Sequence, residues 1–411
     1  MPAGKGARVI PIVAQGKSAG APGGTLEFCN PPPLSLYVHI PWCVRKCPYC
    51  DFNSHEGRGE IPEAEYLAAL LADLEAALAL VWGRRVGSVF FGGGTPSLLS
   101  GRVVDQLLTA LRSLLSIAPD AEITLEANPG TVEAAKFAAF RDAGVNRLSL
   151  GIQSFNPAHL QALGRIHDDR QAHQAIEICA AHFDNFNLDL MYGLPGQTLE
   201  EALADVDTAL TFAPPHLSCY QLTVEPNTAF ASTPPVLPDP DLCADMQEAI
   251  EARLSRGENS AGYTHYETSA FARPGRQCRH NLNYWTFGDY LGIGAGAHGK
   301  LTLHDRVLRQ MRWKQPRQYM DKVGQASPLQ EEFAVKTADL PFEFMMNALR
   351  LNQGFDAALF EARTALPLRV IENQLRQAAD DGLIARRDGR IAPTERGQRY
   401  LNRLLERFLS E

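Results

Sequence analysis

The sequence predicts an α/β protein with six strand–helix repeats, followed by a C-terminal α-rich module. Two observations predict it. Short runs of β-branched and aromatic residues alternate with longer amphipathic stretches, and this alternation ends after residue 222. Alternation at this spacing implies parallel βαβ units. Six repeats suit either an open doubly wound sheet or a partial, TIM-like (β/α)6 barrel, and the alternation alone leaves both open.

The expected elements follow one another in a regular order along the chain. Strands are expected at 34–40, 88–91, 122–127, 147–152, 185–191 and 216–222. Helices are expected at 63–82, 101–115, 131–143, 157–182 (in two pieces), 198–211 and 242–256. Helix starts are indicated by Pro62, a first-turn proline, and by Thr198, which Glu200 and Glu201 follow.

Composition sets the domain organisation. Residues 1–33 hold six Gly and six Pro and are predicted to be a flexible tail. Residues 34–300 are predicted to form the barrel core with an extension, and residues 301–340 a linking segment.

Residues 341–411 are predicted to form a separate winged-helix-like domain. Its helices are expected at 341–351, 356–364, 368–381 and 394–409, with a β-hairpin at 383–391. This module contains 11 Arg and 10 acidic residues, so it lacks the basic face that DNA binding needs, and a docking role is favoured.

Charge and hydropathy argue against nucleic-acid binding and against a membrane span. The 411 residues are 45% hydrophobic and carry a net charge of −8, which argues for a globular core and against a nucleic-acid partner. The longest apolar stretch, 67–82, is interrupted by Asp73 and Glu75, so no membrane span is expected. The N-terminus has no secretory-signal core. We therefore expect a cytoplasmic protein.

Three of the eight cysteines, Cys43, Cys47 and Cys50, lie within eight positions. A disulfide framework is not expected in a cytoplasmic chain. A zinc site would need a fourth ligand, which His39 or His55 can supply. An iron–sulfur cluster would use the three thiolates and leave one iron open. The spacing alone leaves zinc and cluster both possible.

The position of these cysteines favours an iron–sulfur cluster over a zinc site. Cys43 lies three residues beyond the first expected strand, and polar or glycine-rich groups follow the next strands. Active sites of α/β barrels lie at the carboxyl ends of the strands, so these groups are expected to converge on the cysteines. They are the Gly92-Gly93-Gly94-Thr95-Pro96 segment, Glu126, Gln153 and Asp189.

Several motifs in residues 34–200 resemble those of radical S-adenosylmethionine (SAM) enzymes, in particular the oxygen-independent coproporphyrinogen III oxidase family and its heme-chaperone relatives. The matching segments are Tyr37-x-His-Ile-Pro-x-Cys43-x₃-Cys47-x₂-Cys50, Gly92–Pro96, Glu126-x-Asn-Pro129, Gly151-x-Gln-Ser-Phe155, Gly164-Arg165-x-His167 and Asp189-Leu-x-Tyr-Gly-Leu-Pro-Gly-Gln-Thr198. The resemblance implies a partial (β/α)6 radical SAM barrel and a [4Fe-4S] cluster held by the three cysteines.

The resemblance also implies a SAM site. Gly93 and Gly94 would let backbone approach the methionyl group, Glu126 and Asp189 would accept hydrogen bonds from its amine or the ribose, and Arg165 would pair with its carboxylate. Each of these residues alone also has an ordinary structural explanation. The other residues assigned to SAM are Tyr37, Tyr49, Thr95, Gln153 and His298.

Two features separate the chaperone branch from the oxidase branch. Phe52 stands where the oxidases typically carry a fourth cysteine. The segment from His280 to Trp285 resembles the chaperone motif His-Asn-x-x-Tyr-Trp, which makes His280 the expected haem ligand and Cys278 an alternative.

The expected function is therefore that of a radical-SAM-type heme chaperone. It would carry haem as cargo to haem-acceptor proteins and use an electron donor such as flavodoxin or ferredoxin. Whether it also catalyses a reaction is left open. Two alternatives remain: an oxygen-independent oxidase that converts coproporphyrinogen III to protoporphyrinogen IX, and a zinc-stapled scaffold.

Overall fold

The computed structural model describes residues 26–57, 59–131, 134–256, 260–325 and 327–409. Most of the expected tail, residues 1–25, therefore lies outside the described residues. The part of it that is described is anchored. Leu26 and Phe28 pack against the hydrophobic cluster of Val307, Val335 and Leu340, and the Phe28 amide donates to the His304 carbonyl oxygen at 2.9 Å.

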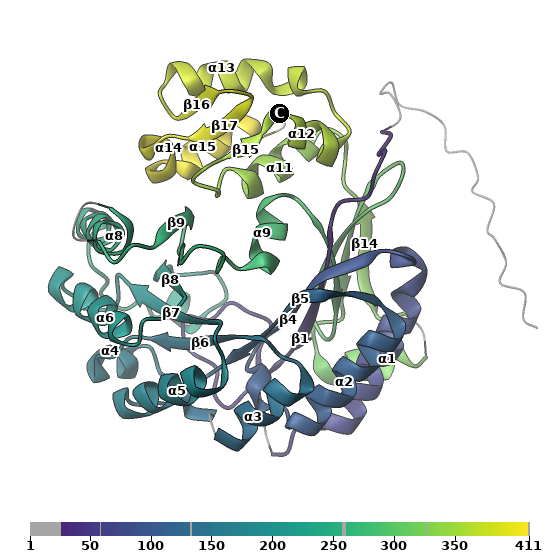
Figure 1. Cartoon of the computed structure of the whole chain (residues 1–411), viewed down its shortest axis with the longest axis vertical. Coiled ribbons are helices and arrows are strands. Elements are labelled where there is room, and N and C mark those ends of the chain that lie inside the picture. Colours follow the sequence, from purple (N-terminus) through teal and green to yellow (C-terminus); the bar gives the residue numbers. More distant parts are fainter. Residues whose placement is uncertain (1–25, 58, 132–133, 257–259, 326, 410–411) are drawn as a thin grey trace, which may run out of the picture.

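A strongly curved 12-stranded sheet forms the body of the protein (Figure 1). Its strand order is β14-β13-β12-β11-β1-β4-β5-β6-β7-β8-β10-β9. The strands from β11 to β8 run parallel: β11 (Asp289–Ile293), β1 (Leu34–Ile40), β4 (Arg85–Gly93), β5 (Ser116–Ala127), β6 (Arg147–Gln153), β7 (Phe186–Tyr192) and β8 (His216–Gln221). Within the described residues the two end strands do not pair, so the expected partial barrel is confirmed.

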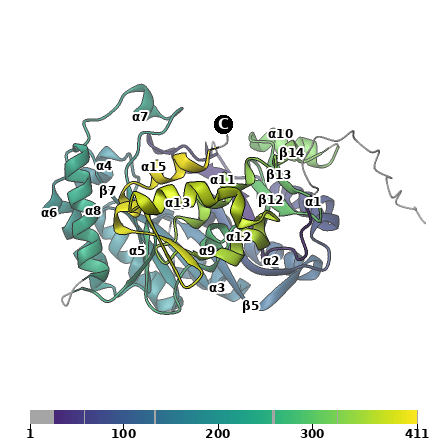
Figure 2. The same ribbon diagram turned by 90° about the horizontal axis from the view of Figure 1, so that it is seen from above.

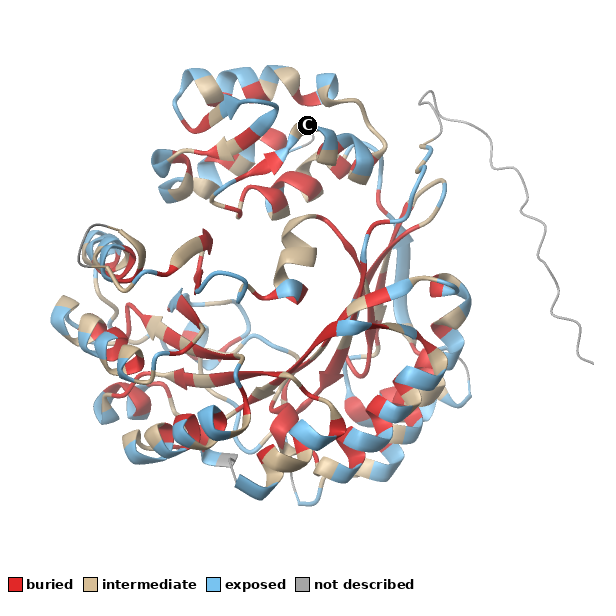
Figure 3. Ribbon diagram, in the orientation of Figure 1, coloured by how far each residue is buried: buried red, intermediate tan, exposed pale blue. Residues whose placement is uncertain are grey.

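Helices cover the outer, convex face of the sheet (Figures 1 and 2). They are α1 (Glu63–Val81), α2 (Gly101–Leu114), α3 (Ala134–Ala143), α4 (Pro157–Ala162), α5 (Asp169–His182), α6 (Leu199–Thr211) and α8 (Pro240–Ser255). Capping boxes start α5 at Asp168 and α6 at Thr198. The six expected strands and these helices are confirmed, because hydrophobic periodicity and helix caps are local signals. Figure 3 shows the resulting buried layer between strands and helices.

The expected linking segment, 301–340, is wrong as a linker, because it contributes strands to the sheet and a helix packed on the barrel. The antiparallel strands β12 (His298–Thr302), β13 (Val307–Arg312) and β14 (Leu329–Ala334) extend one edge, and α10 (Pro316–Val323) packs on α1. The other edge carries β10 (Ala270–Ala272) and β9 (Thr264–Glu267). These strands were missed because they bury polar residues such as Lys300 and Arg312, which look like surface positions in the sequence.

The C-terminal module packs around a hydrophobic cluster that includes Phe344, Phe360 and Leu375. Its helices are α11 (Leu340–Ala348), α12 (Ala357–Thr364), α13 (Glu372–Asp380), α14 (Glu395–Arg399) and α15 (Leu401–Leu405), and its strands are β15 (Phe355–Asp356), β16 (Ile384–Arg387) and β17 (Arg390–Pro393). The expected hairpin turns at Asp388 and Gly389, which have φ of 49° and 77°.

This module lies over the open side of the curved sheet (Figure 1). Phe287 packs edge-on against Phe344, with ring centroids 5.8 Å apart. The Arg363 guanidinium donates to the Thr286 carbonyl oxygen at 3.2 Å. The short remaining elements are β2 (Trp42–Cys43), β3 (His55–Glu56), α7 (Ala229–Ser232) and α9 (Arg279–Trp285). None of the described helices has the length and apolar character that crossing a membrane requires.

Candidate functional site

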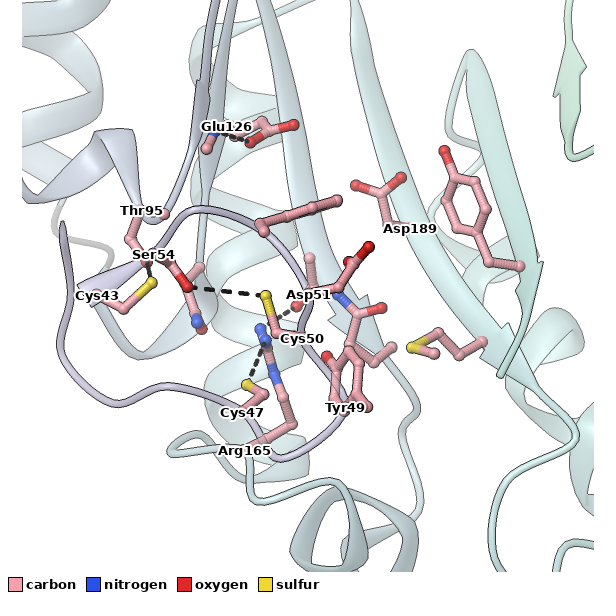
Figure 4. A pocket seen from close by; sticks show the side chains of 18 of the residues that line it. Cys43, Cys47, Tyr49, Cys50, Asp51, Ser54, Thr95, Glu126, Arg165 and Asp189 are labelled. Carbon is pink, nitrogen blue, oxygen red and sulfur yellow. Dashed lines mark hydrogen bonds between the residues drawn. The ribbon is translucent and has the colours of Figure 1, made fainter. Parts of the chain in front are cut away.

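The carboxyl ends of the parallel strands surround a cavity of about 400 Å³, which we call the cysteine cavity. Figure 4 shows the three cysteine side chains on their loop, in the same pocket as Glu126 of β5 and Asp189 of β7. The residues expected at the site that line this cavity are Cys43, Cys47, Tyr49, Cys50, Gly93, Gly94, Thr95, Glu126, Gln153, Arg165 and Asp189. The parallel order of the strands thus brings together groups that are far apart in sequence.

Each sulfur lies within hydrogen-bonding distance of a side chain from this site. The Thr95 hydroxyl donates to Cys43 Sγ at 3.6 Å, and the Arg165 guanidinium donates to Cys47 Sγ at 3.6 Å. Cys50 Sγ lies 3.8 Å from the Ser54 hydroxyl. Burial raises the pKa of the Cys43 and Cys50 thiols. Such contacts to sulfur are the kind that orient and tune thiolate ligands.

The donor set suits an iron–sulfur cluster better than a zinc site. Three thiols share one loop and one cavity, and a guanidinium lies beside one of them. The two histidines considered as a fourth zinc ligand, His39 and His55, do not line this cavity.

The glycine-rich end of β4 is held against the cysteine loop by the chain's own backbone. Gly94 N donates to the Ile40 carbonyl oxygen at 2.8 Å, and a Cβ on Gly94 would lie 2.5 Å from the Trp42 carbonyl oxygen. Gly93 has φ of +112°, and a Cβ there would meet the His39 ring at 2.5 Å. Both positions therefore require glycine for folding, whatever they contact when a ligand is bound.

Two carboxyl groups face each other across the cavity. Burial, assisted by the nearby Asp189 charge, raises the pKa of Glu126 to about 8, although the Gly93 N–H, 3.3 Å from Glu126 Oε2, opposes the shift. Burial also raises the pKa of Asp189, which accepts hydrogen bonds from Ser149 at 2.9 Å and Asn187 at 2.8 Å. A cationic amine entering between these groups would favour their ionised forms.

Arg165 has a buried donor without a partner in the described residues, and Gln153 has an uncommon backbone conformation. The Arg165 guanidinium donates to the Gly151 carbonyl oxygen at 2.7 Å, while its Nε is buried with no partner among the described residues. Gln153 has φ of +69°, an uncommon backbone conformation for a side chain of this size. An orphaned donor and a strained residue on one wall fit the expected SAM site.

The other expected residues line two neighbouring cavities. Tyr37 and His298 line a cavity of about 550 Å³, which we call the aromatic cavity because Phe52, Tyr284, Trp285, Phe287 and Tyr290 line it. Tyr37 and His280 line a third cavity of about 200 Å³. Glu126 lines all three cavities. His298 therefore lines the aromatic cavity and not the cysteine cavity, and its expected place beside SAM stays a prediction.

The ring of His280, the expected haem ligand, is fully engaged. It is 1% exposed, its Nδ1 lies 3.0 Å from the Ser88 hydroxyl, and its Nε2 lies 2.8 Å from the Tyr284 hydroxyl. Burial lowers its pKa to about 3. Ligation of iron would require His280 to give up one of these bonds. The alternative ligand, Cys278, is also buried, with Sγ 3.6 Å from Glu122 Oε1, and burial raises its pKa to about 12.

Several residues of the cysteine cavity carried no recognisable signal in the sequence. They are Ser149, Met191, Tyr220, Gln221 and Glu225. Ser149 lies inside β6 and Tyr220 inside β8, so only the curvature of the sheet turns them toward the site. Side chains along a barrel strand point alternately into and out of the barrel, and this alternation was the one sequence signal that could have identified them.

Comparison with known proteins agrees with this site. Residues 37–209 match the model of the Radical SAM superfamily, and residues 335–400 match the HemN C-terminal domain. The solved structure of coproporphyrinogen III oxidase (HemN) from Escherichia coli, a radical SAM enzyme, matches with a TM-score of 0.77 and 27% identity, covering 92% of this chain and 90% of that chain. The fold is thus that of radical SAM proteins.

The sequence relatives are more specific. The heme chaperone HemW of Escherichia coli is 52% identical over 92% of this chain and 99% of its own length. The heme chaperone HemW of Haemophilus influenzae is 48% identical with the same coverage, and that of Mycobacterium tuberculosis is 38% identical over 89% of this chain and 92% of its own. The chain belongs to the HemW family.

Proposed function

We propose that this protein is a heme chaperone that holds a [4Fe-4S] cluster on Cys43, Cys47 and Cys50, binds SAM in the cysteine cavity, and delivers haem to acceptor hemoproteins. The observation that carries the proposal is the 52% identity to a heme chaperone over almost the whole chain. The convergence of three thiols, an orphaned guanidinium and two carboxyls on one cavity supports the cofactor assignment.

The residues of the cavity have distinct parts in this proposal. Arg165 would direct its free Nε–H toward the SAM carboxylate, while its bond to Cys47 stabilises the thiolate. Glu126 and Asp189 would accept hydrogen bonds from the amine and the ribose hydroxyls. Tyr49, which packs 6.3 Å from Phe230 by ring centroids, would lie beside the adenine. When bound and reduced, the cluster supplies the electron for radical SAM chemistry.

Phe52 favours the chaperone over the oxidase. Its side chain is 60% exposed and lines both the cysteine cavity and the aromatic cavity. A phenyl ring can neither ligate iron nor move a proton there. The proposal extends to a flavodoxin or ferredoxin as electron donor and to the cytoplasm as compartment. No disulfide joins any of the eight cysteines, all of which are described, as is usual in reducing compartments.

The proposal is tested by anaerobic reconstitution followed by haem titration. The protein is expected to take up about four irons per chain, and the cluster absorbance is expected to disappear in Cys43→Ala. Haem added to the same protein should give a saturable Soret band. The control is Cys179→Ala, since Cys179 is buried behind the sheet and should not affect iron content. One zinc per chain with no iron, or no haem binding, would contradict the proposal.

A further inference from the structure

The aromatic cavity has the dimensions and lining of a site for a flat apolar ligand. Its volume of about 550 Å³ lies within the range of small-molecule and cofactor sites, roughly 300–1,000 Å³. Rings from the loop after β1, from α9 and from β11 contribute to its wall. Aromatic side chains bind other ring systems by stacking and edge contacts.

Only one of the two histidines that line this cavity has a free ring. His39 has both nitrogens engaged, by the Tyr37 hydroxyl at 3.1 Å and the Asn53 carbonyl oxygen at 2.9 Å. His298 is exposed, and within the described residues its ring makes no hydrogen bond or ion pair. In the third cavity, the rings of His216 and His280 are both fully hydrogen-bonded.

The surroundings of His298 favour a neutral imidazole, the form that ligates metal ions. Burial, then Lys314 and Arg309, lower its pKa, and Arg312 acts in the same direction. Glu331 acts in the opposite direction and raises the pKa of His298. The His298 side chain is therefore both unoccupied and in its ligating form near neutral pH.

Donors for carboxylate groups lie around the same cavity. The Trp285 indole Nε1 is buried and has no partner among the described residues. Lys314 is exposed and close enough to His298 to affect its pKa. Arg309 also lines the cavity, although Tyr290 and Glu343 already share its guanidinium. A ligand with an apolar ring system and carboxylates at its edge matches this distribution.

The C-terminal module completes the site. Met346 and Asn347 of α11 line the aromatic cavity together with the barrel residues. Met346 is 41% exposed, although its neighbour Met345 is fully buried. Part of its apolar side chain therefore faces the cavity without packing against other side chains. The module would thus contribute directly to ligand binding.

We propose that the aromatic cavity binds haem and that His298 ligates the haem iron. This inference rests on the proposed heme-chaperone function and deepens it, because it moves the ligand from the buried His280 to the accessible His298. The propionates would find donors in Trp285 and Lys314, and the macrocycle would pack on the rings of Phe52 and Tyr284. Because Phe52 lines both cavities, it would separate the cargo from the cysteine cavity.

The test is a haem titration of untagged protein, followed by absorption spectroscopy. In His298→Ala we expect a shifted Soret band and an affinity lower by about tenfold or more. Added imidazole should restore the wild-type band by occupying the vacated position. The matched control is His304→Ala, a histidine whose side chain is 84% exposed and which lines none of these cavities; it should bind as the wild type does.

A second variant tests the cavity rather than the ligand. Met346→Trp would fill the aromatic cavity from α11, so haem affinity should fall while the thermal unfolding midpoint stays unchanged. If wild-type protein binds no haem, the proposed function itself fails. If wild-type protein binds haem but His298→Ala keeps both its Soret band and its affinity, the function stands and this inference is overturned. Undiminished binding in Met346→Trp would also overturn it.

Discussion

The buried carboxylate of Asp73 should be one of the most sensitive positions in the fold. It lies on α1 at 0% exposure and accepts hydrogen bonds from Arg312 Nε and Nη2, both at 3.2 Å, from the Tyr319 hydroxyl at 2.9 Å and from the Gly294 amide at 3.1 Å. These partners belong to β13, to α10 and to the turn after β11. Asp73 therefore ties the missed strands to the helical layer and supports the wall of the aromatic cavity.

The size of the effect follows from the burial of both charges. The Arg312 side chain is 1% exposed, so Asp73→Ala leaves a guanidinium buried without a counter-charge. Breaking a buried pair in this way costs about 3–5 kcal/mol. That is a large share of the roughly 5–15 kcal/mol by which proteins are stable. We expect a correspondingly lower urea midpoint, followed by circular dichroism.

A double-mutant cycle makes this prediction refutable. Replacing both partners, in Asp73→Leu with Arg312→Met, should recover much of the loss, since a buried ion pair exchanged for apolar groups is often neutral. The matched single-residue control is Glu65→Ala, whose pair with Arg317 is solvent-exposed and should cost at most about 1 kcal/mol. A loss below about 1 kcal/mol in Asp73→Ala would refute the reasoning.

Three further predictions concern the cysteine cavity. The folded-state pKa of Glu126 is raised from 4.5 to about 8, so the folded protein keeps a proton that the unfolded chain loses. The free energy of unfolding of the ligand-free protein should therefore fall as the pH rises through this window. Urea unfolding measured across this pH range should show no such fall in Glu126→Gln. Gly94→Val should lower the melting temperature as well as SAM binding, because its Cβ would lie 2.5 Å from the Trp42 carbonyl oxygen; an unchanged melting temperature would contradict this. Arg165→Lys keeps the positive charge but loses the several N–H donors of the guanidinium. SAM affinity measured by equilibrium dialysis should therefore fall about tenfold. An undiminished affinity would argue against a contact between Arg165 and the SAM carboxylate.

Local patterns were enough to predict the six parallel strands and their helices, while the choice of a partial barrel over an open sheet came from the family resemblance. The six parallel strands are buried runs bounded by turn residues, and capping residues such as Asp168 and Thr198 mark the helix starts. The convergence of Glu126 and Asp189 with the cysteines follows from parallel pairing, which places strand ends at one edge of the sheet. The hairpin around Gly389 was likewise indicated by its turn residues.

The antiparallel edge could not be predicted in the same way. Lys300 is stabilised in the core by Asp289 on the adjacent strand, and Arg312 by Asp73, which is 239 residues away in the sequence. Hydropathy read residue by residue cannot predict the burial of such paired charges. The hydrogen-bond partners of His280 could not be predicted for a related reason. The motif that contains His280 says nothing about Ser88 or Tyr284 occupying its ring nitrogens, and only the folded structure shows it.

The most direct test of the chaperone assignment is a product assay with coproporphyrinogen III. The protein, reconstituted with iron and sulfide and reduced under anaerobic conditions, is incubated with SAM and this substrate, and tetrapyrroles are separated by chromatography. An authentic oxidase in parallel confirms that the conditions support turnover. We predict that this protein forms no protoporphyrinogen IX, while the same preparation binds haem with a saturable Soret band. Formation of protoporphyrinogen IX at the rate of the oxidase would contradict the assignment.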